Sequence, residues 1–376
     1  MKKENKLWGK LIIFGCFVAV LLISLIFSKF IEFGLMLKPN LSNIGTNAFE
    51  IHFVDVGNGD AILVKFSNGK TMIVDSGAKL SEKKLLTYID NVFFEDDKNK
   101  MFDFAVLTHS DSDHAGNMLT VLNNYKVKTF IRPKIYVKNL ETGASGEQNY
   151  FDNSSDYAQI VTKLFELEKE NKTKVEFAEF NTFYFTGLNA GMHILAPVKS
   201  YYNETNKLSS VMVVFDGEHK VMLTGDATIE NEREIINNYN VSKLDVDVLK
   251  LGHHGSNTST SLEFLEATTP KYAVVSVSKL NKYHPSQEVL NNIVSYNKNN
   301  PTNKVLVKQT SNLGNIVFYA NGEDEFEILN IENVDDYLFL SWWIVVLCLV
   351  VVVGVSMFLP TLIALILKST KSAIKN

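Results

Sequence analysis

Two imidazoles and two carboxylates lie within six residues of one another, in the stretch 109–114, which reads HSDSDH. The stretch follows a short apolar run, residues 104–107, that is typical of a buried strand, and a helical pattern begins near Asn117. The four side chains therefore leave the carboxyl end of a strand together, just ahead of a helix. Capping that helix needs only one of them, such as Asp113, whereas a metal ion needs several ligands of these types. The spacing indicates a metal site.

Further apolar runs supply the elements that must position this stretch. Strands are expected at 51–56, 61–66 and 72–74, and again at 211–215, 220–223 and 246–251. Helical spacing is seen at 80–92, 118–125, 158–169, 229–239 and 287–296. Strands, then mixed strands and helices, then strands again suit two sheets packed face to face with helices outside. The predicted fold class is therefore an α/β sandwich of the αββα type.

The stretch 109–114 resembles the H-x-[HD]-x-D-H signature of the metallo-β-lactamase superfamily. With Asp111 in place of the second His, it is similar to the ComEC-type branch, named for the hydrolase-like domain of a DNA-uptake channel. Five further segments match that branch in order, at residues 53–60, 73–77, 223–226, 249–256 and 283–286. The likeness extends over residues 48–330 and departs at Asn58, where the branch usually has Gln. The sequence shows no multi-helix channel domain, so a role in DNA uptake is not carried over.

The resemblance implies a domain that binds two divalent metal ions through carboxylates and imidazoles. The implied ligands are His109, Asp111 and a bridging Asp226 for the first ion, and Asp113, His114, Asp226 and His253 for the second, with His254 and Asp60 as further candidates. Zinc is the expected ion, and Mn²⁺ is the alternative because the carboxylate of Asp111 is a harder ligand than an imidazole. Asp55 and Asp75, at other strand ends, are interpreted as turn residues or as support for the ligands.

The resemblance also implies catalytic roles for Asp113, Asn206 and His284. Two metal ions about 3.5–4 Å apart can share a hydroxide and lower its pKa toward about 7, and Asp113 is among the ligands that supply it. Asn206 stands where the superfamily often has a third His. Because an amide is a poor zinc ligand, Asn206 is expected to hold a metal-bound water or the substrate. His284 would bind a phosphate or protonate a leaving oxygen, whereas an ordinary histidine of a surface loop would do neither.

Two apolar segments flank the part of the chain that carries the motifs. Residues 11–27 form an unbroken apolar run after four lysines, and residues 338–367 are nearly continuous apolar sequence followed by three lysines. We expect a membrane anchor over 1–38, the hydrolase-like domain over 39–337, and a transmembrane helix with a basic tail over 338–376. The lysines on the outer flanks predict two cytoplasmic tails and an extracytoplasmic domain at the cell membrane. A cleaved signal peptide is the alternative for the first segment, although no A-x-A-type site follows it.

The charge balance bears on the partners of the domain. Residues 39–337 carry 28 basic and 40 acidic residues, a balance of −12, and only two of the basic residues are arginines. A protein that binds a nucleic-acid backbone normally has a basic face, and none is evident here, so a long duplex is a disfavoured partner. Cys16 and Cys348 both lie in the apolar segments, which leaves the domain without a disulfide framework or a thiolate metal site.

The sequence thus predicts a membrane-tethered metallo-hydrolase, a phosphodiesterase that acts on short or single-stranded nucleic acid or on a cell-envelope phosphodiester. The alternative is a non-catalytic binding or sensing module at the membrane, stabilised by its metals. An intact ligand set speaks against that alternative, because drift usually removes a ligand first. A β-lactamase or lactonase is disfavoured by Asp111 and Asn206. The sequence does not choose among the phosphodiester substrates.

Overall fold

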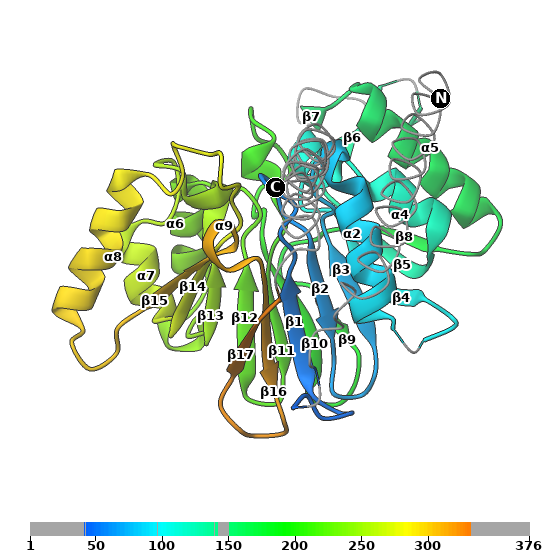
Figure 1. Cartoon of the computed structure of the whole chain (residues 1–376). Helices are drawn as coiled ribbons and strands as arrows, with labels where there is room; N and C mark the ends of the chain where they lie inside the picture. The colour runs from blue at the N-terminus through cyan, green and yellow to red at the C-terminus, as the bar shows by residue number, and fades with distance from the viewer. Residues whose placement is uncertain (1–40, 42, 96, 139, 142–149, 332–376) are drawn as a thin grey trace, which may run out of the picture. The chain divides into compact units, whose positions relative to one another are not determined.

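Short apolar runs between tight turns form two β-sheets that pack face to face, with helices on both outer faces (Figure 1). The computed structural model describes residues 41, 43–95, 97–138, 140–141 and 150–331, all of which belong to one unit, Pro39–Glu332. For this part of the chain the predicted α/β sandwich is confirmed. Its strand order explains how distant motifs come together.

The first sheet has eight strands in the order β17-β16-β1-β2-β3-β4-β5-β8. Their bounds are Phe49–Phe53 (β1), Ile62–Lys65 (β2), Thr71–Val74 (β3), Met101–Val106 (β4), Lys126–Arg132 (β5), Lys174–Phe177 (β8), Asn315–Ala320 (β16) and Glu327–Ile331 (β17). Strands β1 to β3 are antiparallel neighbours, whereas β3, β4, β5 and β8 run parallel. Parallel neighbours have their carboxyl ends at the same edge, so the loops after β3 and β4 lie side by side.

The second sheet has seven strands in the order β15-β14-β13-β12-β11-β10-β9. Their bounds are Phe183–Phe185 (β9), Ala190–Ala196 (β10), Val211–Asp216 (β11), His219–Leu223 (β12), Val248–Lys250 (β13), Tyr272–Val275 (β14) and Leu306–Gln309 (β15). Strands β12 to β15 run parallel, so the loops after β12, β13 and β14 also share an edge. A separate pair, β6 (Ile135–Tyr136) and β7 (Tyr150–Phe151), lies outside both sheets.

Alternating side chains build the layers. In β1, Phe49, Ile51 and Phe53 join the core between the sheets, whereas His52 points the other way and contacts Tyr88. Helices α2 (Glu82–Tyr88), α4 (Met118–Asn124) and α5 (Ser155–Lys169) cover the outer face of the first sheet (Figure 1). Helices α6 (Ile229–Asn238), α7 (Leu262–Thr268) and α8 (Gln287–Asn299) cover the second sheet. Each layer of helices packs on its sheet through a separate hydrophobic cluster.

Two local details differ from the sequence prediction. The helix expected over 80–92 is divided into a 3₁₀ turn (Lys79–Ser81), α2 and a π-helical turn (Ile89–Phe93). Strand β9 was not predicted, because three residues are too short a run to show alternation. The predicted membrane segments over 1–38 and 338–376 lie outside the described residues. Within the described part, no helix combines the length and the hydrophobicity that crossing a membrane requires.

Candidate metal centre

The parallel strands bring the predicted ligands to one edge of the sandwich. The stretch 109–114 follows β4 and overlaps the short helix α3 (Ser112–Ala115). Asp226 follows β12, and the two histidines of the turn η5 (Gly252–Gly255) follow β13. Asp60 lies just before β2. The ligands therefore come from both sheets and meet where the two edges face each other.

The carboxylate of Asp226 is buried, and its two oxygen atoms face two different pairs of imidazoles. Oδ1 lies 3.1 Å from His114 Nε2 and 3.5 Å from His254 Nε2. Oδ2 lies 3.6 Å from His253 Nε2 and 3.9 Å from His109 Nε2. A carboxylate that presents one oxygen to each of two ligand groups is suited to bridge two metal ions.

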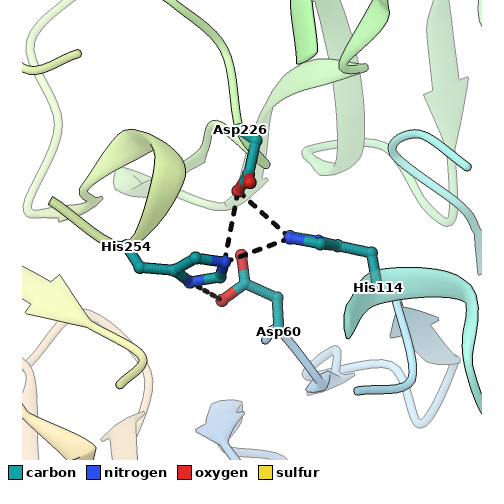
Figure 2. Close-up of side chains that lie close together, drawn as sticks. All are labelled: Asp60, His114, Asp226 and His254. Carbon is teal, nitrogen blue, oxygen red and sulfur yellow. Dashed lines mark hydrogen bonds and ion pairs between the residues drawn. The ribbon is translucent and has the colours of Figure 1, made fainter. Parts of the chain in front are cut away.

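The two carboxylates of the stretch 109–114 each join one of these groups. Asp111 Oδ2 lies 3.8 Å from His109 Nε2, and Asp113 Oδ2 lies 3.4 Å from His254 Nε2. We refer to the residues around Oδ2 of Asp226 as the first group and to those around Oδ1 as the second group. The first group is His109, Asp111 and His253, and the second group is Asp113, His114 and His254. Figure 2 shows Asp226 between two imidazoles of the second group, with Asp60 beside them.

The grouping differs in one respect from the ligand set that the sequence predicted. That set gave His253 to the second ion and named His254 only as a further candidate. In the structure His254 lies with the second group, 3.3 Å from His114 between Nε2 atoms, while His253 faces the other oxygen of Asp226. Spacing along the chain could not separate two adjacent histidines. Which of them binds each ion stays a prediction.

The backbone of these two histidines is strained. His253 (φ 46°, ψ 46°) and His254 (φ 54°, ψ 23°) are both left-handed, which costs a non-glycine residue about 1–3 kcal/mol. The turn is held by a hydrogen bond from the His253 N–H to the carbonyl of Gly225 at 3.1 Å. Consecutive side chains of a strand point to opposite faces, whereas this turn directs both imidazoles at Asp226. Such strain is typical of functional sites.

Asp75 and Thr108 orient the histidines of the stretch 109–114. Asp75 Oδ2 accepts hydrogen bonds from His114 Nδ1 and from the Thr108 hydroxyl, both at 2.7 Å. The same hydroxyl oxygen lies 3.0 Å from His109 Nδ1 and can accept its proton. With the proton on Nδ1, each imidazole presents an unprotonated Nε2 toward Asp226. Of the two interpretations of Asp75, the structure favours support for the ligands.

The polar atoms of the second group need a positive charge between them. In a neutral His114 with its proton on Nδ1, the lone pair of Nε2 would face Asp226 Oδ1 at 3.1 Å, and two lone pairs at that distance repel unless a proton or a metal ion lies there. Burial alone would lower the pKa of His114, but the carboxylates of Asp226 and Asp75 outweigh it and raise that pKa well above its usual value. Burial would raise the pKa of Asp226, yet His114 and His254 hold it well below its usual value.

The first group also contains an atom suited to a metal. Within the described part of the chain, His109 Nε2 is buried and has no hydrogen-bond partner. Burial and the neighbouring His114 lower the pKa of His109, which favours the neutral ring with a free lone pair. Imidazole nitrogens with carboxylate oxygens are ligands of Zn²⁺, and the carboxylates also suit Mn²⁺. The residues present therefore fit a pair of divalent ions.

Asp60 is paired with a buried lysine that the sequence analysis missed. Lys250 Nζ lies 3.0 Å from Asp60 Oδ2, outside hydrogen-bond alignment, and donates to the carbonyl of Leu251 at 2.8 Å. Asp60 Oδ1 lies 3.9 Å from His254 Nδ1 (Figure 2). Asp60, His114, Asp226 and His254 can each offer one ligand atom within 4.8 Å of the others. The available signal for Lys250 was a lysine inside the apolar run 246–251.

Asn206 and His284 lie beside His253. Asn206 Nδ2 is 3.5 Å from His253 Nδ1, and the ring centre of His284 is 6.1 Å from that of His253. Among the residues that the structure describes, Asn206 Oδ1 and His284 Nδ1 are buried atoms without hydrogen-bond partners. Burial, together with His253 and His254, lowers the pKa of His284, which favours its neutral form. Both side chains thus retain a polar atom that can contact a substrate.

Comparison with known proteins places this geometry in a family. Residues 54–279, more than half of the chain, match the metallo-beta-lactamase superfamily. The chain belongs to this superfamily. Members share a hydrolase fold that typically binds divalent metals, and this chain has a buried cluster of Asp and His residues around Asp226 that could hold a metal ion.

Three relatives confirm the ComEC-type resemblance of this metallo-β-lactamase domain. ComE operon protein 3 of Bacillus subtilis is 28% identical over 278 residues, which cover 69% of this chain and 32% of the relative. Recombination protein 2 of Haemophilus influenzae is 27% identical over 259 residues, covering 66% and 27%. Competence protein ComA of Neisseria gonorrhoeae is 27% identical over 240 residues, covering 64% and 28%. The chain thus spans about a third or less of the length of each relative.

Among solved structures, the long form RNase Z from yeast is similar over 80% of this chain and 44% of its own. Its sequence identity is 11% and the TM-score is 0.41, which is too low to support an inference about this chain.

Proposed function

We propose that the chain is a metal-dependent hydrolase that cleaves phosphodiesters with two divalent ions held around Asp226. The observation that supports this most directly is that each oxygen of the Asp226 carboxylate faces its own pair of imidazoles, at 3.1–3.5 Å and at 3.6–3.9 Å. When bound, two such ions supply Lewis acidity for a phosphoryl oxygen and a water activated near neutral pH.

The side chains of the protein bind the ions and orient the substrate. Asp75 holds a proton on Nδ1 of His114 directly and on Nδ1 of His109 through Thr108, so that Nε2 is the atom of each ring that would face an ion. His284 Nδ1 can donate a hydrogen bond to a phosphoryl or leaving oxygen, because nothing in the described residues occupies it. Asn206 Oδ1 can accept one from a water or a hydroxyl group.

The substrate that we propose is a short or single-stranded nucleic acid or a cell-envelope phosphodiester. The names of the relatives, recombination and competence proteins, support nucleic acid. The balance of −12 over residues 39–337 disfavours a long duplex, because binding a duplex relies on release of counterions from many phosphates. From the flanking apolar segments we further propose a membrane tether, with both tails cytoplasmic and the domain outside.

The test is a substrate screen of the full chain in detergent, loaded with Zn²⁺ or Mn²⁺. We expect hydrolysis of bis-p-nitrophenyl phosphate and of single-stranded DNA or RNA, and slower cleavage of a long duplex. Asp226→Asn should abolish turnover, and His284→Ala should slow it by about 10²-fold. Asp245→Asn, which changes an exposed carboxylate shortly before the amino end of β13, is the matched control.

Two results would contradict the proposal. A chain that holds close to two ions but cleaves none of these substrates would favour the binding or sensing module. Tight duplex binding with a steep salt dependence would show that the charge argument is wrong.

A further inference from the structure

The loop that carries His284 is anchored by one side chain from a turn of the first sheet. Asn58 Oδ1 accepts hydrogen bonds from the Ser278 N–H and from Asn281 Nδ2, each at 3.1 Å. Asn281 Oδ1 in turn accepts from the N–H groups of Tyr283 at 2.8 Å and His284 at 3.0 Å. Two amide side chains, which we call the amide link, therefore connect the turn 57–59 to the backbone of His284.

The orientation of both amides follows from their partners. A backbone N–H can only donate, so the atom that Asn58 presents to Ser278 must be its oxygen. For the same reason the oxygen of Asn281 must face Tyr283 and His284, which leaves its NH₂ group toward Asn58. Asn58 therefore acts in the link only as an acceptor. Asn281 acts both as a donor and as an acceptor.

Hydrogen bonds, more than apolar packing, hold this side of the loop. Leu280 and Tyr283 are 88% and 83% exposed, and the N–H groups of Leu280 and Asn281 donate to the hydroxyl and the carbonyl of Ser278, at 3.1 and 3.0 Å. After His284 the chain is fixed differently, because the Ser286 N–H donates to the carbonyl of Gly255 at 2.8 Å. His284 thus lies between an anchor to the histidine turn η5 and the amide link.

The turn that carries Asn58 also contacts the metal-binding stretch. Gly59 has φ 114°, and a Cβ atom added there would lie 2.0 Å from the carbonyl oxygen of Asp113. Only glycine permits that approach. The turn 57–59 therefore contacts the backbone of a predicted metal ligand on one side and holds the His284 loop on the other. A fixed turn between them sets the separation of His284 from the ligands.

We propose that Asn58 is a positioning residue, which through Asn281 holds His284 at the substrate side of the metal centre. The inference rests on the proposed function, because it requires His284 to contact substrate. Nothing in the sequence motifs assigned a role to Asn281. In the absence of the link, His284 would sample positions farther from the reacting oxygen, and a displacement of about 1 Å can cost as much as about 10²-fold in rate.

The kinetic test compares substitutions that keep or remove the acceptor. Asn58→Ala should lower kcat by about ten-fold with a smaller change in KM, and should have little further effect in the His284→Ala background. Asn58→Asp should retain most of kcat, because a carboxylate still accepts both hydrogen bonds. Asn281→Asp should not, because Asn281 must also donate. The control is Asn68→Ala, since Asn68 also joins two turns, through Thr186, but at the far end of the sheets.

A second readout follows the loop itself. Lys279 and Lys282 are exposed within it, so limited trypsin digestion with mass spectrometry reports its order. Cleavage after these lysines should be faster in Asn58→Ala than in the wild type, and unchanged in Asn58→Asp and Asn68→Ala, with metal content equal in all four. Unchanged cleavage in Asn58→Ala would overturn the anchoring, and faster cleavage with full kcat would overturn the positioning role. A wild-type chain without hydrolysis would overturn the proposed function and the positioning role with it, while the trypsin comparison still decides the anchoring.

Discussion

Lys250 and Asp60 form an ion pair with both side chains buried, at 3.0 Å between Nζ and Oδ2 and with exposures of 0% and 1%. The lysine belongs to β13 of the second sheet and the aspartate to the turn before β2 of the first. Removing water from both charges is costly, so such a pair contributes little net stability, whereas one partner alone is strongly destabilising. Asp60 Oδ1 also lies 3.9 Å from His254 Nδ1, so the charge of the Asp60 carboxylate acts both on the buried Lys250 and on a predicted metal ligand.

The first prediction concerns this pair. Lys250→Met should lower the free energy of unfolding by about 3–5 kcal/mol, because it leaves the Asp60 carboxylate buried and unpaired. The double variant Lys250→Met/Asp60→Leu should recover much of that loss. Urea unfolding followed by circular dichroism measures both, with the half-exposed Lys271→Met as control. A nearly neutral Lys250→Met would contradict the burial of the pair.

The second prediction concerns metal content. The chain should bind close to two divalent ions, and Asp226→Ala should lose most of both, because one oxygen of Asp226 faces each ligand group. Elemental analysis after dialysis without chelator measures this. No metal in the purified protein, and none after reconstitution, would refute the dinuclear site.

The third prediction separates the two ligand groups. His254→Ala should lose one ion, and adding His114→Ala should lose no more, because both imidazoles face Oδ1 of Asp226. Adding His109→Ala instead should remove the second ion, since His109 faces Oδ2. Metal-to-protein ratios of the three variants decide between the groupings. The grouping is wrong if His114→Ala causes no further loss of metal when added to His253→Ala, but does cause a further loss when added to His254→Ala.

The fourth prediction is a pH dependence of stability at His193. Its ring stacks on Phe183 with centroids 3.7 Å apart, and burial lowers its pKa to about 4. The unfolded chain, with a pKa of about 6.5, binds the proton more tightly, so this contribution is complete above about pH 6.5 and lost as the pH falls toward about 4. The Tm of His193→Phe should therefore fall less than the Tm of the wild type as the pH is lowered over that range. Parallel Tm curves for the two proteins would exclude the effect.

The fifth prediction concerns topology. With both tails cytoplasmic, protease added to spheroplasts should digest residues 39–337 and spare epitopes placed on the two tails. Protection of the domain until lysis would reverse the proposed orientation and move the substrate to the cytoplasm.

The clustering of the candidate ligands could be anticipated from the sequence because its signals are local. The stretch 109–114 places four ligand types directly after a strand, and Asp226 follows another strand in a recognisable motif. The layers followed in the same way from apolar runs whose period fixes the element. Each of these signals lies within one short segment of the chain and can be recognised without knowing which distant residues it contacts.

The rest depends on the folded backbone. The left-handed turn at His253 and His254 decides which oxygen of Asp226 each ring faces, and no spacing rule encodes it. The pair of Lys250 and Asp60 joins two sheets, and the amide link joins residues that are 223 positions apart. Such contacts exist only once both halves of the sandwich have packed.

The two rims of the sandwich are closed by different chemistry. At the far rim the N–H and hydroxyl of Ser67 donate to Asp216 at 2.7 and 2.8 Å, with no cation involved. At the other rim, the residues around Asp226 come from both sheets, and the divalent ions that we propose would join them there. Removing those ions should therefore loosen one rim and leave the other unchanged. Under chelation, amide exchange should become faster around residues 109–114 and 252–255, while the strand ends near Ser67 stay protected.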